Sequence, residues 1–267
     1  MNAIAHPLAL LTLALAGCAA GEAAPKDDAA EAHAGHGHGH AVVEPKDEVA
    51  PTLGIPLDPK GGSAIGLVFE SYLSPHQEAD EETDVPDLAP DAFRSTKTPS
   101  VPREQRPGRG HGVLGFSKDF SKAYVELALD GIDPQEIVMA HIHCGKPGML
   151  GPIIVDFGKT GSVAEYFSDG VLTYEVTNRD LELVLEGASG VVGAFTAGCP
   201  INSVRPDDRV RTLAGMAVVA NEGDLYFNIH TASQTFYGDV RGQLLPRTPW
   251  EALDAPPDAR ERQRATR

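Results

Sequence analysis

The chain has 267 residues, of which 38 are acidic and 22 are basic, giving a formal net charge of -16 at pH 7. Hydrophobic residues make up 42% of the sequence, enough to bury a core, so disorder along the whole chain is excluded. The excess of acid argues against nucleic-acid binding, which relies on lysine and arginine side chains that neutralise phosphates. No apolar run reaches the roughly 18 residues of a membrane-spanning helix.

The first 18 residues have the features of an export signal. Residues 8–16 (LALLTLALA) are an apolar run that is too short to span a membrane and that ends in small residues. The tetrapeptide LAGC, which ends at Cys18, resembles the bacterial lipobox, although no lysine or arginine precedes the apolar run. We therefore expect a signal peptide over residues 1–18, lipidation of Cys18, and a lipid anchor in the bacterial cell envelope, at the outer membrane or facing the periplasm. A plain secretion signal and a buried cytosolic helix are the alternatives.

Residues 19–60 are rich in alanine, glycine, proline and acidic residues and lack hydrophobic periodicity, which predicts a disordered tether. The tether contains the tract HAGHGHGH, with His33, His36, His38 and His40. Imidazole is a ligand of zinc, copper and nickel, and the glycines allow successive rings to turn toward one ion. We expect this tract to serve as an auxiliary metal collector. The alternative is a solvated linker.

From about residue 63 the sequence has the pattern of β-strands. Strands are predicted at residues 64–69, 124–129, 136–143, 152–157, 225–230 and 237–244. Helices are predicted over residues 177–185, behind a capping Thr or Asn, and from about residue 208 to residue 223. Many short strands with one or two short helices indicate an all-β fold, an antiparallel Greek-key-like β-sandwich or barrel over residues 61–246. Residues 247–267 return to charge and proline and are expected to form a loose C-terminal tail.

Residues 74–111 interrupt the strand pattern. An acidic half that contains proline is followed by a basic half that holds Arg94, Lys97, Arg103, Arg106 and Arg109. So long a stretch without periodicity inside a domain is either a functional loop or a disordered insertion, and we predict disorder. The opposite charges of the two halves could fold the segment back on itself or onto a partner.

Three stretches carry a family resemblance. The first is a strand at residues 112–116 (GVLGF), and the second is residues 139–145 (MAHIHCG) running into residues 151–155 (GPIIV). The third is LYFNIHT, which ends at Thr231, followed by GDVRGQL at residues 238–244. Together they resemble the CHRD family, the domain first named from chordin and also found in bacterial exported proteins. The resemblance covers about residues 64–246 and implies an immunoglobulin-like or dismutase-like β-sandwich without a defined enzymatic activity. Asp239 stands where the family more usually has Glu.

If the chain is exported, its cysteines can form disulfides, which form and persist outside the cytosol. With Cys18 lipidated, Cys144 and Cys199 remain as an even pair, and we expect a disulfide between them. The alternative is that Cys144, which directly follows His-Ile-His, is a thiolate metal ligand.

Three histidines of the resembling stretches are candidates for a metal site. Side chains alternate along a strand, so His141 and His143 share one face, and His230 lies on the face opposite the predicted apolar core of its strand. If the two strands are neighbours, the imidazoles could converge as a three-nitrogen site for copper or zinc, with Asp239 as a tentative fourth ligand. The alternative is that these histidines make structural hydrogen bonds.

The function that we expect is a non-enzymatic, lipid-anchored binding protein of the cell envelope, with a copper or zinc ion as its ligand. The alternatives are a non-catalytic module that binds a protein or matrix component, and a copper-dependent dismutase-like oxidoreductase. A dismutase needs a fuller histidine set, and only His76 and His111 remain near the domain. Asp156 is predicted to be a solvated strand residue, and Arg241 is predicted to form a surface ion pair.

Overall fold

The computed structural model describes residues 54–247, except residues 88, 90, 96–99, 189–192, 194–195 and 202–207. The chain divides into two units, Met1–Ile55 and Pro56–Arg267, and the fold below is that of the second unit. The predicted signal peptide with Cys18, the histidine tract at residues 33–40 and the tail after residue 247 lie outside the described residues. None of the described helices combines the length and the apolar character needed to cross a membrane.

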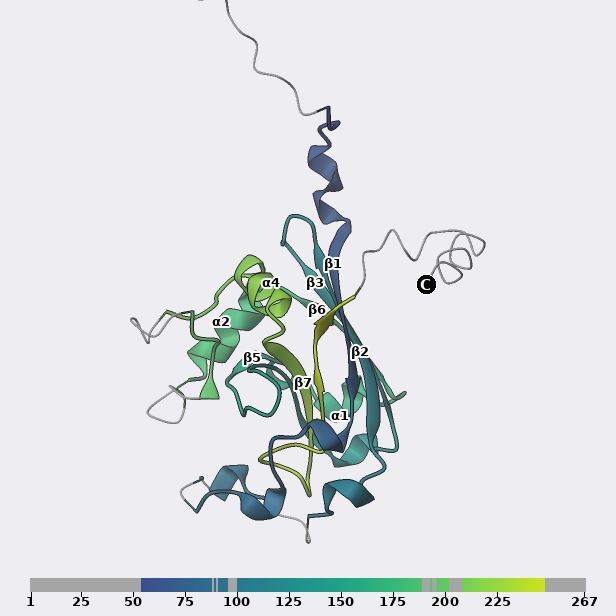
Figure 1. The fold of residues 1–267 in the computed structure, drawn as a ribbon, viewed down its shortest axis with the longest axis vertical. Helices are drawn as coiled ribbons and strands as arrows, with labels where there is room; N and C mark the ends of the chain where they lie inside the picture. Colours follow the sequence, from purple (N-terminus) through teal and green to yellow (C-terminus); the bar gives the residue numbers. More distant parts are fainter. Residues whose placement is uncertain are drawn as a thin grey trace, which may run out of the picture. The chain divides into compact units, whose positions relative to one another are not determined.

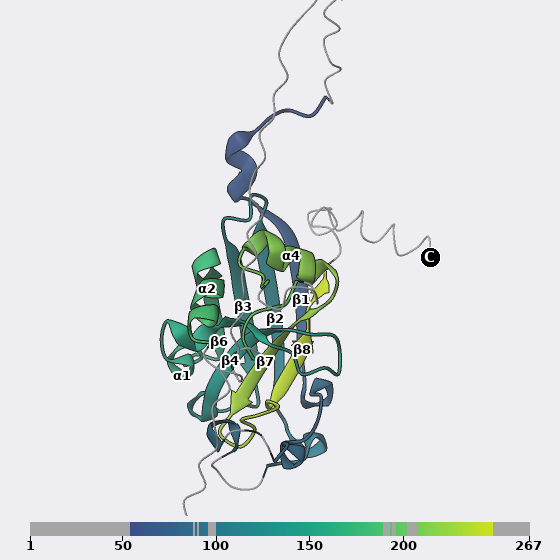
Figure 2. The ribbon, with the colours of Figure 1, turned by 90° about the vertical axis from the view of Figure 1, so that its left-hand side faces the viewer.

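Two antiparallel sheets form the domain, and Figure 1 shows them layered face to face. The larger sheet has the strand order β6-β3-β2-β1-β9 and consists of β6 (Val171–Val176), β3 (Ala123–Asp130), β2 (Arg109–Ser117), β1 (Ile65–Leu73) and β9 (Leu245–Pro246). The smaller sheet has the order β5-β4-β7-β8 and consists of β5 (Ile153–Asp156), β4 (Ile137–Cys144), β7 (Leu225–Thr231) and β8 (Val240–Gln243). The smaller sheet lies in front in Figure 2. The prediction of an antiparallel β-sandwich is therefore confirmed, and the described strands do not close into a barrel.

The alternation of apolar and polar residues explains the core between the sheets. In β3, Val125 and Leu127 are buried, whereas Glu126 between them is exposed. Apolar side chains from both sheets fill the space between them, among them Phe69, Leu114, Phe116, Val125, Leu127, Ile142, Ile154, Phe227 and Ile229. Burial of this apolar surface stabilises the sandwich and fixes the register of each strand, because a slip of one residue would turn the apolar face outward.

The helices are α1 (Val163–Tyr166), α2 (Asn178–Glu186) and α4 (Leu213–Asn221). At the start of α2, Thr177 and Asp180 form a capping box in which each side chain accepts from the other residue's backbone N–H. Thr212 caps α4 by accepting from the backbone N–H of Gly215. Both predicted helices are thus confirmed near their expected positions. Strand β6 and the single turn α1 were not predicted.

The described residues of the segment at 74–111 form short turns and pack against the domain. It carries four 3₁₀ turns, η2 (Pro75–Gln77), η3 (Glu82–Asp84), η4 (Asp91–Phe93) and η5 (Arg103–Gln105). Glu81 from the acidic half pairs with Arg103 at 2.7 Å and with Arg106 at 3.2 Å from the basic half. Glu82 accepts from the backbone N–H groups of residues 235–237, which ties the segment to the β7–β8 connection (Figure 2). In the described residues the opposite charges therefore pair within the segment, which is the folding back that the sequence offered as the alternative to disorder.

Candidate metal site

Strands β4 and β7 are neighbours in the smaller sheet, as the convergence of the three histidines requires. Their antiparallel register places Met139 opposite His230 and His143 opposite Tyr226. Residues 139, 141 and 143 alternate on β4 and lie on one face, and His230 reaches that face from β7. The face points away from the apolar core but is covered, because the three histidines are between 3% and 5% exposed.

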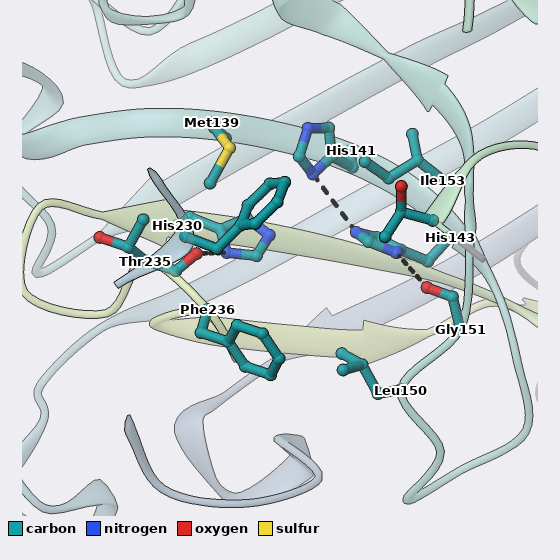
Figure 3. Close-up of a pocket in the computed structure, with 11 residues that line it drawn as sticks. Met139, His141, His143, Leu150, Gly151, Ile153, His230, Thr235 and Phe236 are labelled. Atoms are coloured by element: carbon teal, nitrogen blue, oxygen red, sulfur yellow. Dashed lines mark hydrogen bonds between the residues drawn. The ribbon is translucent and has the colours of Figure 1, made fainter. Parts of the chain in front are cut away.

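The three imidazoles converge on one point (Figure 3). One ring nitrogen from each of His141, His143 and His230 lies within 4.8 Å of the other two. Nε2 of His143 and Nδ1 of His141 are 3.3 Å apart and form a hydrogen bond. Two nitrogens bound at about 2.0–2.1 Å to a tetrahedral ion are separated by about 3.3 Å, so this pair already has the spacing of ligands on a shared metal.

Hydrogen bonds on the outer side of the rings fix which nitrogens are free. Nδ1–H of His143 donates to the carbonyl of Gly151 at 2.8 Å, and Nδ1–H of His230 donates to the carbonyl of Thr235 at 3.0 Å. Nε2 of His143 and Nε2 of His230 therefore carry lone pairs directed into the site, and the latter is buried without a hydrogen-bond partner among the described residues. A backbone carbonyl on the far nitrogen is the usual outer-shell partner of a metal-bound histidine.

His141 has the opposite orientation. Its Nε2 lies 3.6 Å from Oδ1 of Asp156, its cross-strand neighbour on β5. Because Nε2 of His143 carries a lone pair, Nδ1–H of His141 is the donor in the 3.3 Å bond between the two rings. A metal ion at the common point would replace that proton, and the Asp156 carboxylate would then favour the His141 proton at Nε2. The three candidate ligand atoms are therefore Nδ1 of His141, Nε2 of His143 and Nε2 of His230.

Burial keeps the three rings neutral. Desolvation lowers the pKa of His143 to about 3 and that of His230 to about 4. The pKa of His141 is also held well below its usual range, first by burial and then by the neighbouring His143 and His230. A ring that is neutral at pH 7 offers the lone pair that a metal ion needs.

A small apolar cavity opens onto the ligand atoms (Figure 3). Its volume is about 150 Å³, and the side chains around the histidines include Phe93, Met139, Leu150, Ile153 and Phe236. A second cavity of about 420 Å³ shares His141 and Met139 with it and adds Asp156 and Lys159. The histidines are thus reached through a mostly apolar pocket with one polar side.

A stack of three side chains supports His143 from behind. The ring of Tyr226 lies parallel to that of His143, with centroids 5.0 Å apart, and the guanidinium of Arg241 lies 3.4 Å from the centroid of Tyr226. Arg241 also donates to the carbonyls of Met149 and Lys146 at 2.7 and 2.9 Å. The prediction of a surface ion pair for Arg241 is wrong: its side chain is 1% exposed and holds the loop that follows β4.

The same loop brings Gly151 to His143. Tyr226 Oη accepts from the backbone N–H of Gly151 at 3.0 Å, on the residue whose carbonyl accepts from His143. A side chain at this position would collide with the carbonyl of Cys144, so only glycine allows the loop to approach β4 so closely. Cys144 is joined to Cys199 in a disulfide, as predicted, and its alternative role as a thiolate ligand is excluded.

The other candidate residues lie elsewhere. Asp239 is not part of the histidine cluster, and its Oδ1 lies 3.9 Å from Arg106. His111 is on β2 in the larger sheet, where it contacts Glu70 at 2.8 Å. The histidines of the tract at residues 33–40 and Cys18 lie outside the described residues.

Sequence reasoning missed the residues that orient the ligands. Asp156, expected to be solvated, is one-fifth exposed and faces His141, and Gly151 and Thr235 supply carbonyls from loops. The register of the hairpin between β4 and β5 would have identified Asp156, because it is the direct partner of His141. The two carbonyls leave no signal in the sequence, since every residue has one.

A CHRD domain is found over residues 93–244, which is more than half of the chain. The match includes β2 to β8 and with them the three histidines, whereas β1 precedes it. No curated protein and no solved structure gives a match. The chain therefore belongs to the CHRD domain family.

Proposed function

We propose that this protein binds a transition-metal ion, copper or zinc, through His141, His143 and His230. The observation that carries the proposal is the orientation of three buried, neutral imidazoles, each with one ring nitrogen next to an oxygen and the other directed at a common point. Three nitrogens at this spacing suit Zn(II) and copper. A set of purely structural histidines would not need an unpartnered Nε2 on His230.

We further propose that the protein acts in the bacterial cell envelope, held there by a lipid on Cys18. The apolar run and the LAGC sequence support this proposal. The disulfide between Cys144 and Cys199 is consistent with an oxidising compartment. The acidic, histidine-rich tether would collect cations near the membrane, and the domain would hold one of them in a defined geometry.

Calorimetric titration with Zn(II) and Cu(II) tests the metal site. To remove the metal ligands of the tether, we use a tether-substituted protein. It is the full chain in which Cys18 is replaced by serine and four histidines are replaced by alanine, namely His33, His36, His38 and His40. We expect it to bind one ion per chain, and we expect His230→Leu to abolish that binding. Replacement of Leu150, which lines the same pocket without a donor atom, by alanine is the matched control. A tether-substituted protein that takes up neither metal at micromolar concentrations would contradict the proposal.

A further inference from the structure

A fourth potential donor stands beside the three imidazoles. Met139 lies two residues before His141 on the same face of β4, and it is the direct register partner of His230. It lines both cavities that contain His141, and Figure 3 shows its thioether beside His230 on the pocket side. A thioether is a soft ligand that binds Cu(I) and contributes little to Zn(II), whose ligands in proteins are thiolate, imidazole and carboxylate.

The ligand atoms themselves bring no negative charge. An imidazole that donates a lone pair to a metal ion is a neutral ligand, and Cys144 is held in its disulfide. Asp156 is on the far nitrogen of His141 and is shared with Lys159 at 3.8 Å, and Asp239 lies outside the cluster near Arg106. The charge of a bound ion would therefore remain largely uncompensated by its ligands.

A buried cation adds to this effect. Arg241 is stacked on Tyr226, which is stacked on His143, so one ring separates a fixed positive charge from a ligand. Glu78, a buried carboxylate near Arg241, offsets this charge only in part, because burial holds its pKa well above the usual range and disfavours its ionised form. The cost of burying an ion rises with the square of its charge, so a neutral, apolar pocket of this kind favours a monovalent ion over a divalent one.

On these grounds we propose that the site holds copper as Cu(I), with the sulfur of Met139 as the fourth donor beside the three imidazoles. The inference rests on the proposed function and specifies its ion. It assigns Met139 a direct role in selecting the metal.

The test compares Met139→Leu with its parent, both in the tether-substituted protein. Leucine has nearly the volume of methionine, so the pocket stays filled while the sulfur is lost. Cu(I) is supplied anaerobically as its acetonitrile complex, and its affinity is measured by competition with bicinchoninate. Zn(II) affinity is measured in parallel with a chromophoric chelator. Leu150→Ala, which changes the pocket without removing a donor, is the control.

We expect Met139→Leu to weaken Cu(I) binding by about tenfold or more and to leave Zn(II) binding unchanged. Removing a residue that only hydrogen-bonds to a metal ligand already weakens metal binding by about tenfold or more. X-ray absorption at the copper edge should show one sulfur scatterer in the parent and none in the variant. The inference would be overturned if parent and variant bound Cu(I) equally strongly and the copper-edge spectrum of the parent showed nitrogen scatterers without sulfur. The proposed function would then still stand. A parent that binds neither ion would instead overturn the proposed function.

Discussion

Lowering the pH should unfold the metal-free protein through its three buried histidines. In the unfolded chain each histidine titrates at a pKa of about 6.5. In the folded chain, burial lowers the pKa of His143 to about 3 and that of His230 to about 4, and holds that of His141 well below its usual range. The unfolded state therefore binds more protons between pH 6.5 and pH 4, so stability is present at neutral pH and is lost as the pH falls through this window.

The magnitude follows from the two pKa values. Between pH 7 and pH 5, a histidine with a folded pKa of about 3 or 4 and an unfolded pKa of about 6.5 reduces the free energy of unfolding by about 2 kcal/mol. His143 and His230 together account for roughly 4 kcal/mol, which is a large part of the roughly 5–15 kcal/mol that stabilises a typical domain, and His141 acts in the same direction. Glu78 and Asp239 act in the opposite direction, because burial raises their pKa and the folded state then binds the proton.

Differences between variants isolate the histidine contribution. Urea unfolding at pH 7 and at pH 5, with a chelator present, measures how much free energy of unfolding the parent and His230→Leu lose between the two pH values. We expect the loss to be smaller in His230→Leu by about 2 kcal/mol, because one buried proton acceptor has been removed. Met139→Leu lies in the same pocket without a titrating group and should retain the parent's loss. An equal loss in all three proteins would refute the assignment of neutral, buried imidazoles.

Three further predictions concern the disulfide, the stack behind His143 and the tether. Replacing both Cys144 and Cys199, which are separated by 55 residues, with serine should lower the free energy of unfolding by about 4 kcal/mol in the chain-entropy account, measured by urea denaturation; a loss near zero would contradict it. Arg241→Lys keeps the positive charge but loses the planar guanidinium that binds two carbonyls. We expect Zn(II) binding, measured by chelator competition, to be about 10–100-fold weaker. An unchanged Zn(II) affinity would show that the stack does not position His143. Zn(II) binding at the domain should persist from pH 7 to about pH 5.5. Zn(II) binding by the tract at residues 33–40 should weaken once the pH is below about 6.5, because free imidazole is protonated there. Matching pH profiles of Zn(II) binding for the tether-substituted protein and for a variant without the domain histidines would contradict this prediction.

Much of the fold could be predicted because strand patterns are local. The alternation in β3 and β7 identified their apolar faces, and the Thr177 cap marked the start of α2. The converging histidines followed from the same rule, once β4 and β7 were taken as neighbours. Strand β6 could have been found as well, because Leu172 and Val176 are its buried residues at even spacing.

The environment of the site could not be predicted from the sequence. All seven residues of β7 are buried, so the second face is covered even though its residues are polar. The cover comes from segments without periodicity, such as η4 with Phe93 and the loop that Arg241 holds. Whether Arg241 lies at the surface or in the interior depends on that cover, and therefore on long-range contacts that the local sequence does not encode.

Nitrogen NMR of the imidazoles tests most directly whether three specific ring nitrogens bind one metal ion. Zn(II) added to the tether-substituted protein with ¹⁵N-labelled histidine should shift the resonances of Nδ1 of His141 and of Nε2 of His143 and His230. The change should be complete at one equivalent of Zn(II). The far nitrogens should keep their protons and their bonds to Gly151 and Thr235. Spectra in which these three nitrogens do not respond to Zn(II), or in which the far nitrogens respond instead, would contradict the account.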